Sequence, residues 1–121
     1  MRFALIILSC VLSYNSFAGT VLKLEADGFM REAMMTRNEE EGFAGTVTMG
    51  DCMGTFMYEP MISMVMINFE GSCSSENMEV DMSKENFNML LSGSAVMTSF
   101  RCAKYFMRDM KGTVSIVMPV N

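Results

Sequence analysis

The segment VLKLEADGFMREAMM, residues 21–35, has the pattern of a β-hairpin. At its centre, Asp27-Gly28 is a favoured two-residue turn, because both positions of such a turn need a positive φ angle. With this turn, Lys23 faces Glu32 on one side of the hairpin, and the other side is mainly apolar. A half-buried strand has one apolar side in the core and one polar or mixed side in solvent. The segment therefore predicts antiparallel strands with one face in the core.

Three later segments add to this sheet. Residues 61–70 are apolar on both sides of an extended chain, which predicts a central strand. Residues 83–91 predict a short helix, with Ser83 as its N-cap and Gly93 just beyond its end. Residues 113–120 predict a closing strand at an edge of the sheet.

The segment 95–111 fits two different structures. Apolar residues recur there at spacings of four and three, as on one helix face: Val96, Phe100, Ala103, Met107 and Met110. The β-prone residues Val96 and Thr98 favour a strand instead. We prefer the helix. We thus expect an α+β domain, a small antiparallel sheet with one or two helices at about 83–91 and 95–111. The alternative is a mainly-β sandwich.

The N-terminus has the pattern of a cleavable signal peptide. Arg2 provides a positive charge, and a mostly apolar run follows it. Ser16-Phe17-Ala18 then places small residues before a cut at Gly19. The apolar run is shorter than the roughly 20 residues that cross a bilayer. The pattern therefore predicts export and removal of this segment.

We expect residues 1–18 to be the signal peptide and residues 19–121 to form a single exported domain, periplasmic or extracellular. A competing route is lipidation of Cys10, because residues 7–10, ILSC, are similar to the lipobox of bacterial lipoproteins. Both kinds of compact signal indicate a bacterial source. The mature chain has no second apolar stretch long enough to be a transmembrane segment.

The chain is acidic, with nine basic and fourteen acidic residues and a net charge of −5 at pH 7. This balance argues against nucleic-acid binding, which depends on basic residues that neutralise phosphates. A helix over 95–111 would place four basic residues on one stripe: Arg101, Lys104, Arg108 and Lys111. The stripe predicts contact with an anionic partner, such as lipid headgroups, cell-wall polymer or an acidic protein.

Three cysteines remain after cleavage at Gly19, so one disulfide and one leftover thiol are expected in an oxidising compartment. Cys52 and Cys73 lie among glycine, serine and aspartate, which is typical of loops. Cys102 lies in an apolar segment and is expected to be a buried thiol. We favour a Cys52–Cys73 disulfide, while the other two pairings stay open.

The absence of histidine excludes whole classes of chemistry. A Ser-His-Asp or Cys-His catalytic site cannot be built, nor can a histidine-ligated zinc or blue-copper centre. The sequence has no phosphate-binding loop and no GxSxG motif. Acidic pairs such as Glu79 and Asp81 are typical of a solvated face. We therefore expect no enzyme activity, no catalytic residue and no cofactor.

Methionine is unusually abundant, with 17 residues in the chain. The simplest interpretation is that methionine replaces leucine in a flexible core. An alternative is copper(I) or silver binding by thioethers, which suit soft ions. The pair Met64 and Met66 has a suitably short spacing, but residues 61–70 look like core, where ligands would be hidden. A third interpretation is a methionine-rich contact surface for a protein partner.

These observations predict a small exported protein of the cell envelope with a non-catalytic binding or structural role. Its expected partner is an unknown protein or an anionic envelope component, and not nucleic acid. The alternative function is soft-metal binding through methionine thioethers.

Overall fold

The computed structural model of the protein describes residues 20–38 and 43–117. The predicted signal peptide, residues 1–18, lies outside the described residues, and so does the predicted lipidation site Cys10. The last residues of the predicted closing strand, 118–120, also lie outside them.

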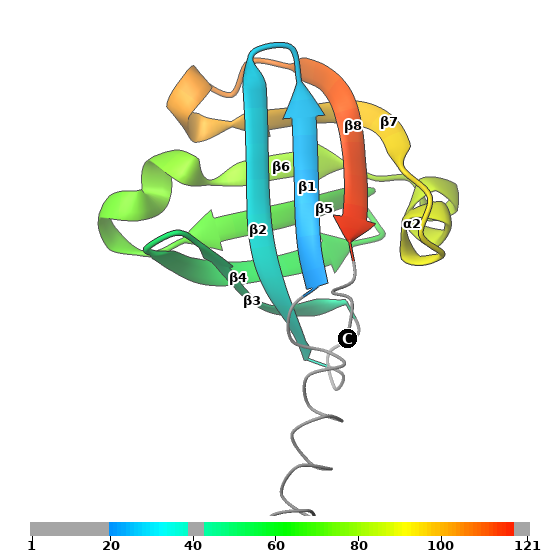
Figure 1. Ribbon diagram of the computed structural model, residues 1–121, viewed down its shortest axis with the longest axis horizontal. Coiled ribbons are helices and arrows are strands. Elements are labelled where there is room, and N and C mark those ends of the chain that lie inside the picture. Colours follow the sequence, from blue (N-terminus) through cyan, green and yellow to red (C-terminus); the bar gives the residue numbers. More distant parts are fainter. Residues whose placement is uncertain (1–19, 39–42, 118–121) are drawn as a thin grey trace, which may run out of the picture.

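The described residues form eight strands, with three short helical segments between them (Figure 1). The strands are β1 Thr20–Ala26, β2 Phe29–Asn38, β3 Ala44–Met49, β4 Cys52–Glu59, β5 Met64–Phe69, β6 Met78–Asp81, β7 Val96–Cys102 and β8 Met110–Val117. The helical segments are the 3-10 helix η2 Gly71–Glu76, the α-helix α2 Lys84–Leu91 and the 3-10 helix η3 Ala103–Tyr105.

The strands form one closed antiparallel barrel in which each strand pairs with the next along the chain. The barrel closes where β8 pairs with β1, with Leu24 opposite Val114. A Cβ at Gly112 would collide with the backbone oxygen of Glu25, so glycine is required at this closing contact. Closure leaves the sheet without a free edge.

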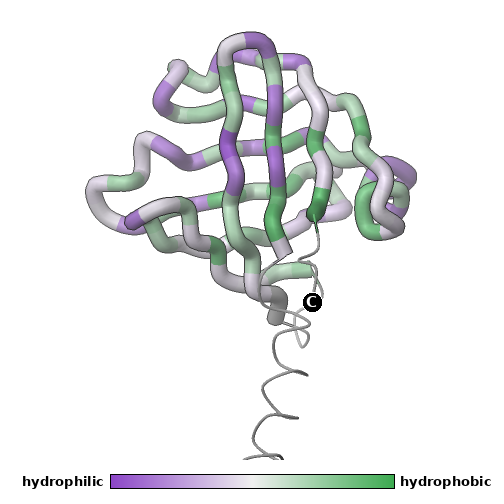
Figure 2. The backbone as a smooth tube through the Cα atoms, viewed as in Figure 1, coloured by the Kyte–Doolittle hydropathy of each residue, from purple (hydrophilic) through white to green (hydrophobic). Residues whose placement is uncertain are grey.

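The predicted α+β fold is wrong, because α2 is the one α-helix of the described residues and the rest is mainly strand. The mainly-β alternative fits better, although the sheet closes into a barrel instead of splitting into a sandwich. In β1, at the front of the barrel, the buried Leu22 and Leu24 alternate with the outward Lys23 and Glu25 (Figure 2). The inward side chains of a single curved sheet therefore fill its own interior, and no helix layer is needed.

The predicted helix over 95–111 is also wrong. Residues 96–102 form β7, whose inward residues Val96, Phe100 and Cys102 are buried. A spacing of four residues is compatible with both structures, because it returns to the same face of a strand as well as of a helix. The β-branched and aromatic residues, paired with β6 and β8 on either side, favour the strand.

The other local predictions have mixed outcomes. The hairpin of residues 21–35 is confirmed in register, with Lys23 opposite Glu32. The helix predicted at 83–91 is confirmed as α2, where Ser83 Oγ accepts a hydrogen bond from the backbone N–H of Asn86 at 3.1 Å. The central strand predicted at 61–70 is shorter, and only its inward side is buried, because the barrel has no second layer.

Buried side chains from every strand form one core inside the barrel. The core includes Leu24, Phe56, Ile67, Phe100 and Val114, all nearly inaccessible. A remaining apolar cavity of about 10 Å³ has room for at most one water molecule. In the described part of the chain, side chains from all eight strands thus pack the interior around this cavity.

The two ends of the barrel are closed differently. At one end, which we call the α2 end, Leu90 of α2 is buried and the Phe87 ring stacks on Tyr58 at 4.1 Å between ring centroids. At the other end, which we call the η2 end, η2 joins β5 to β6 and η3 lies between β7 and β8. In Figure 1, the α2 end lies to the right, and η2 and η3 lie to the left.

Candidate functional site

The η2 end is held by a disulfide. Cys52, at the start of β4, is joined to Cys73 of η2, with 5.7 Å between their Cα atoms. This is the pair that the loop-like sequence around both cysteines favours. The bond fixes η2 against the neighbouring strands across a sequence separation of 21 residues.

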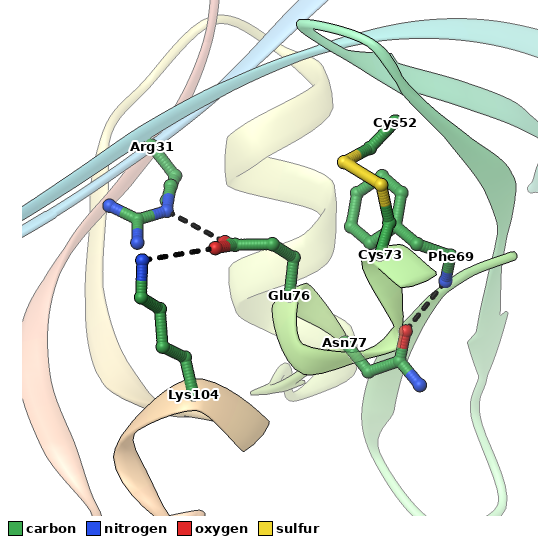
Figure 3. The surroundings of a disulfide bond; sticks show 7 residues. All are labelled: Arg31, Cys52, Phe69, Cys73, Glu76, Asn77 and Lys104. Carbon is green, nitrogen blue, oxygen red and sulfur yellow. Dashed lines mark hydrogen bonds and ion pairs between the residues drawn. A yellow bond between two sulfur atoms is a disulfide. The ribbon is translucent and has the colours of Figure 1, made fainter. Parts of the chain in front are cut away.

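The carboxylate of Glu76, the last residue of η2, binds two cations on the flank opposite the disulfide (Figure 3). Arg31 donates from Nε to Oε1 at 2.9 Å, and Lys104 Nζ lies 3.7 Å from Oε2. Burial alone would lower the pKa of Arg31, but its hydrogen bonds to Glu76 and Tyr105 outweigh burial and raise it. The guanidinium therefore stays charged and ties β2 to η2.

Cys102 is a free, buried thiol on the inner side of β7, as its apolar sequence context predicts. Its Sγ lies 3.7 Å from the backbone oxygen of Ser75. Burial raises the pKa of Cys102, so the thiol stays protonated at neutral pH. Since the thiolate is the reactive form, burial disfavours nucleophilic chemistry at Cys102, which packs as a small apolar side chain.

The segment between β7 and β8, residues 103–109, forms a compact projecting loop, which we call the β7–β8 loop. The backbone N–H of Phe106 donates to the oxygen of Ala103, and that of Met107 donates to the oxygen of Cys102, each at 3.0 Å. These nested bonds are the arrangement that ends many helices, with a left-handed residue at the position of Phe106. Glycine usually occupies that position, because it has no Cβ to clash.

Phe106 takes this position although it is a poor residue for it. Its backbone is left-handed, with φ 58° and ψ 33°, and Met107 follows with φ 56°. The Phe106 side chain is also 94% exposed, so it gains little from burial in the fold. Strained backbone conformations of this kind are concentrated at functional sites.

The four basic residues predicted to form a stripe are distributed differently in the structure. Arg101 lies on the outer side of β7 and donates to Asp81 at 2.6 Å, to Asp109 at 3.0 Å and to Glu79 at 3.2 Å. The hydrogen bond to Asp81 is the main cause that raises its pKa. The charge of Arg101 is therefore already balanced by neighbouring carboxylates.

The other three basic residues lie in the β7–β8 loop or just after it. Lys104 lies in η3 with its ion pair to Glu76, Arg108 lies in the loop itself, and Lys111 lies on β8. Among the described residues, Arg108 and Lys111 make no ion pair. The helical stripe does not exist, but three of its four residues flank the exposed Phe106.

Phe106 was not among the residues predicted from the sequence, because a helix over 95–111 would have made it an ordinary helical residue. A left-handed backbone at a phenylalanine leaves no mark in the sequence. The one available signal is the composition of residues 105–108, Tyr-Phe-Met-Arg. This segment contains no glycine, proline or asparagine, the residues that usually make a turn.

Most methionines lie outside the core, contrary to the simplest interpretation of their abundance. Met35, Met78 and Met82 are buried. Eight others are exposed: Met30, Met34, Met53, Met57, Met61, Met89, Met97 and Met107. Leucine-like packing therefore accounts for only a minority of the described methionines.

Among the described residues, no cluster of three or more histidine, cysteine, aspartate or glutamate side chains could hold a metal ion. Within the described part of the chain, no helix is both long enough and apolar enough to cross a membrane.

Comparison with protein-family models, with curated proteins and with solved structures gave no match. The structure itself therefore defines the class of protein, a closed eight-stranded antiparallel barrel with a packed interior.

Proposed function

We propose that this protein is an exported, non-catalytic binding protein of the cell envelope that docks Phe106 into an apolar pocket of a protein partner. The observation that carries the proposal is the exposed Phe106 ring, held outward by a backbone conformation that disfavours phenylalanine. The N-terminal signal pattern and the Cys52–Cys73 disulfide are compatible with export.

The composition of the loop supports a protein partner. Aromatic residues, methionine and arginine are enriched in protein–protein interfaces, and residues 105–108 contain only these types. Aromatic and arginine side chains also dominate the residues on which binding energy depends. Phe106 is the anchor in this proposal, and Arg108 and Lys111 meet acidic residues on the rim of the pocket.

A protein pocket fits the surrounding charges better than a flat anionic membrane does. In an up-and-down barrel, alternate connections lie at the same end, so the η2 end also carries Asp27, Asp51 and Glu70. A bilayer that met Phe106 would also approach these acidic side chains. A pocket in a protein contacts the projecting loop alone.

The packed barrel supports binding on the outside of the molecule. Barrels that hold small ligands keep an internal cavity open, whereas inward side chains fill this one. The buried thiol of Cys102, with its raised pKa, also favours a non-catalytic role.

Site-specific photo-crosslinking in the native host tests the proposal. A photoreactive phenylalanine analogue replaces Phe106 in one variant and Met97 in a control, because Met97 is 72% exposed on the outer side of β7. We expect one discrete protein adduct from position 106 and none from position 97. Salt from 50 to 500 mM should weaken its capture, because the screening length falls from about 14 to about 4 Å.

Three outcomes would contradict the proposal. Adducts at both positions would indicate non-specific contact. No adduct at either position would show that Phe106 has no protein partner in the host. Adducts with lipid in place of protein, together with binding to vesicles that contain phosphatidylglycerol, would replace the protein partner with a membrane.

A further inference from the structure

Three methionines form a triangle on the outer face of β4 and β5. Met57 of β4 is the direct cross-strand partner of Met66 of β5. Met64 lies two residues before Met66 on the same face of β5. Direct cross-strand partners have Cβ atoms about 5 Å apart, and diagonal neighbours remain within reach of long side chains.

The three side chains are accessible from solvent. Met57 is 41% exposed, and Met64 and Met66 are half-buried. The sequence predicted that these residues are hidden in the core, but the structure places them on the outer face. Their inward neighbours Val65 and Ile67 form the core in their place.

The fold does not require methionine at these positions. On the adjacent strand β3, the outward residues Thr46 and Thr48 are threonines. Threonine is a good strand former and its hydroxyl suits a solvated face. Methionine is less favourable in strands, and three of them on one exposed face expose apolar surface. Their shared property is a soft thioether sulfur.

Carboxylates surround the triangle. Met64 lies between Glu59 of β4 and Asp81 of β6, and Met66 lies beside Glu79 of β6. Arg101 binds Asp81 and Glu79 and offsets part of this charge. Among the described residues Glu59 makes no ion pair, so the patch keeps a negative potential that attracts cations.

We infer that Met57, Met64 and Met66 form a surface site for a soft monovalent cation, copper(I) or silver(I). Thioether ligands select such ions over hard cations, which prefer oxygen. Methionine side chains are flexible enough for three sulfur atoms to converge on one ion. The site is independent of the β7–β8 loop and of its protein partner.

Titration of the mature, disulfide-bonded protein with silver(I) tests the inference, because silver(I), unlike copper(I), is not oxidised in air. Native mass spectrometry should detect one bound ion, and NMR of ¹³C-methyl-labelled methionine should shift the signals of Met57, Met64 and Met66. Met57→Leu/Met64→Leu/Met66→Leu should weaken binding at least about tenfold, or about 1.4 kcal/mol. Leucine keeps the volume and apolarity, so the variant should fold.

Two controls give the experiment its specificity. Met30→Leu/Met34→Leu/Met53→Leu changes three other exposed methionines and should bind silver(I) like the wild type. Cys102→Ala removes the one free cysteine of the described residues and should also leave binding unchanged.

The inference is overturned if the wild type binds no silver(I), or if binding survives the change at positions 57, 64 and 66. Loss of binding in Cys102→Ala would assign the ion to the thiol and would also overturn it. NMR of the wild type tests the site without any variant, because shifts confined to other methionines contradict it.

Discussion

The two ends of the barrel are closed by different chemistry. The α2 end is apolar, with Leu90 buried and Phe87 stacked on Tyr58 and set edge-on to Phe43 at 4.8 Å between centroids. The η2 end is held by a disulfide and by the ion pairs of Glu76. Among the described residues, Phe106 at the η2 end is the one exposed aromatic residue with a left-handed backbone.

This difference separates stability from binding. Apolar packing at the α2 end depends on many side chains that bury one another and leaves few of their atoms for a partner. A disulfide and a short ion-pair network fix η2 locally, so the neighbouring β7–β8 loop is supported without being covered. We therefore expect truncation of buried side chains in the core and at the α2 end to cost the most stability, and we place the proposed recognition at the η2 end.

Leu90→Ala should have the largest effect on the free energy of unfolding. The side chain is 2% exposed, and removing buried leucine carbons typically costs about 2–5 kcal/mol. Met89→Ala, on the exposed side of the same helix, is the matched control and should cost less than about 1 kcal/mol. Urea unfolding followed by circular dichroism measures both, and equal losses would contradict an apolar closure by Leu90.

Cys52→Ala/Cys73→Ala should have the next largest effect. For a sequence separation of 21 residues, loss of loop closure corresponds to roughly 3 kcal/mol in the chain-entropy model. The measurement is the urea midpoint of the double variant against that of the wild type under oxidising conditions. An unchanged midpoint would show that η2 does not need the covalent bond.

Glu76→Gln should destabilise the protein by about 1–2 kcal/mol, because it leaves Arg31 hydrogen-bonded but without its counter-charge in a partly buried site. Glu85→Gln, at an exposed position in the first turn of α2, loses only a favourable interaction with the helix dipole, should cost less than about 1 kcal/mol and serves as the control. Thermal unfolding compares the two. A loss for Glu85→Gln as large as for Glu76→Gln would point to a general charge effect in place of the local ion pair.

Sequence reasoning succeeded where one local signal had one structural meaning. The Asp27-Gly28 turn fixed the register of the first hairpin, and Ser83 with Gly93 bounded α2. It failed over residues 95–111, where the four-residue step from Val96 to Phe100 fits a helix and a strand alike and tertiary pairing favours the strand.

Neither the closure of the barrel nor the candidate sites could be predicted from a local sequence signal. Closure depends on the pairing of β8 with β1, at opposite ends of the described chain. The Met57–Met66 pair likewise needs the register of β4 on β5, and the left-handed backbone of Phe106 depends on hydrogen bonds around η3. These are non-local or conformational facts that composition and periodicity do not encode.

The most direct test of the central claim is the free energy of unfolding of Phe106→Gly. Glycine removes the cost of a left-handed backbone at this position, about 1–2 kcal/mol. It also lowers stability by about 0.5–1 kcal/mol, because a glycine makes the unfolded chain more flexible. If Phe106 serves a partner and not the fold, this variant should be at least as stable as the wild type, with a gain of up to about 1.5 kcal/mol. A loss of stability of about 1 kcal/mol or more would show that the ring packs in the fold, and would contradict a role in binding alone.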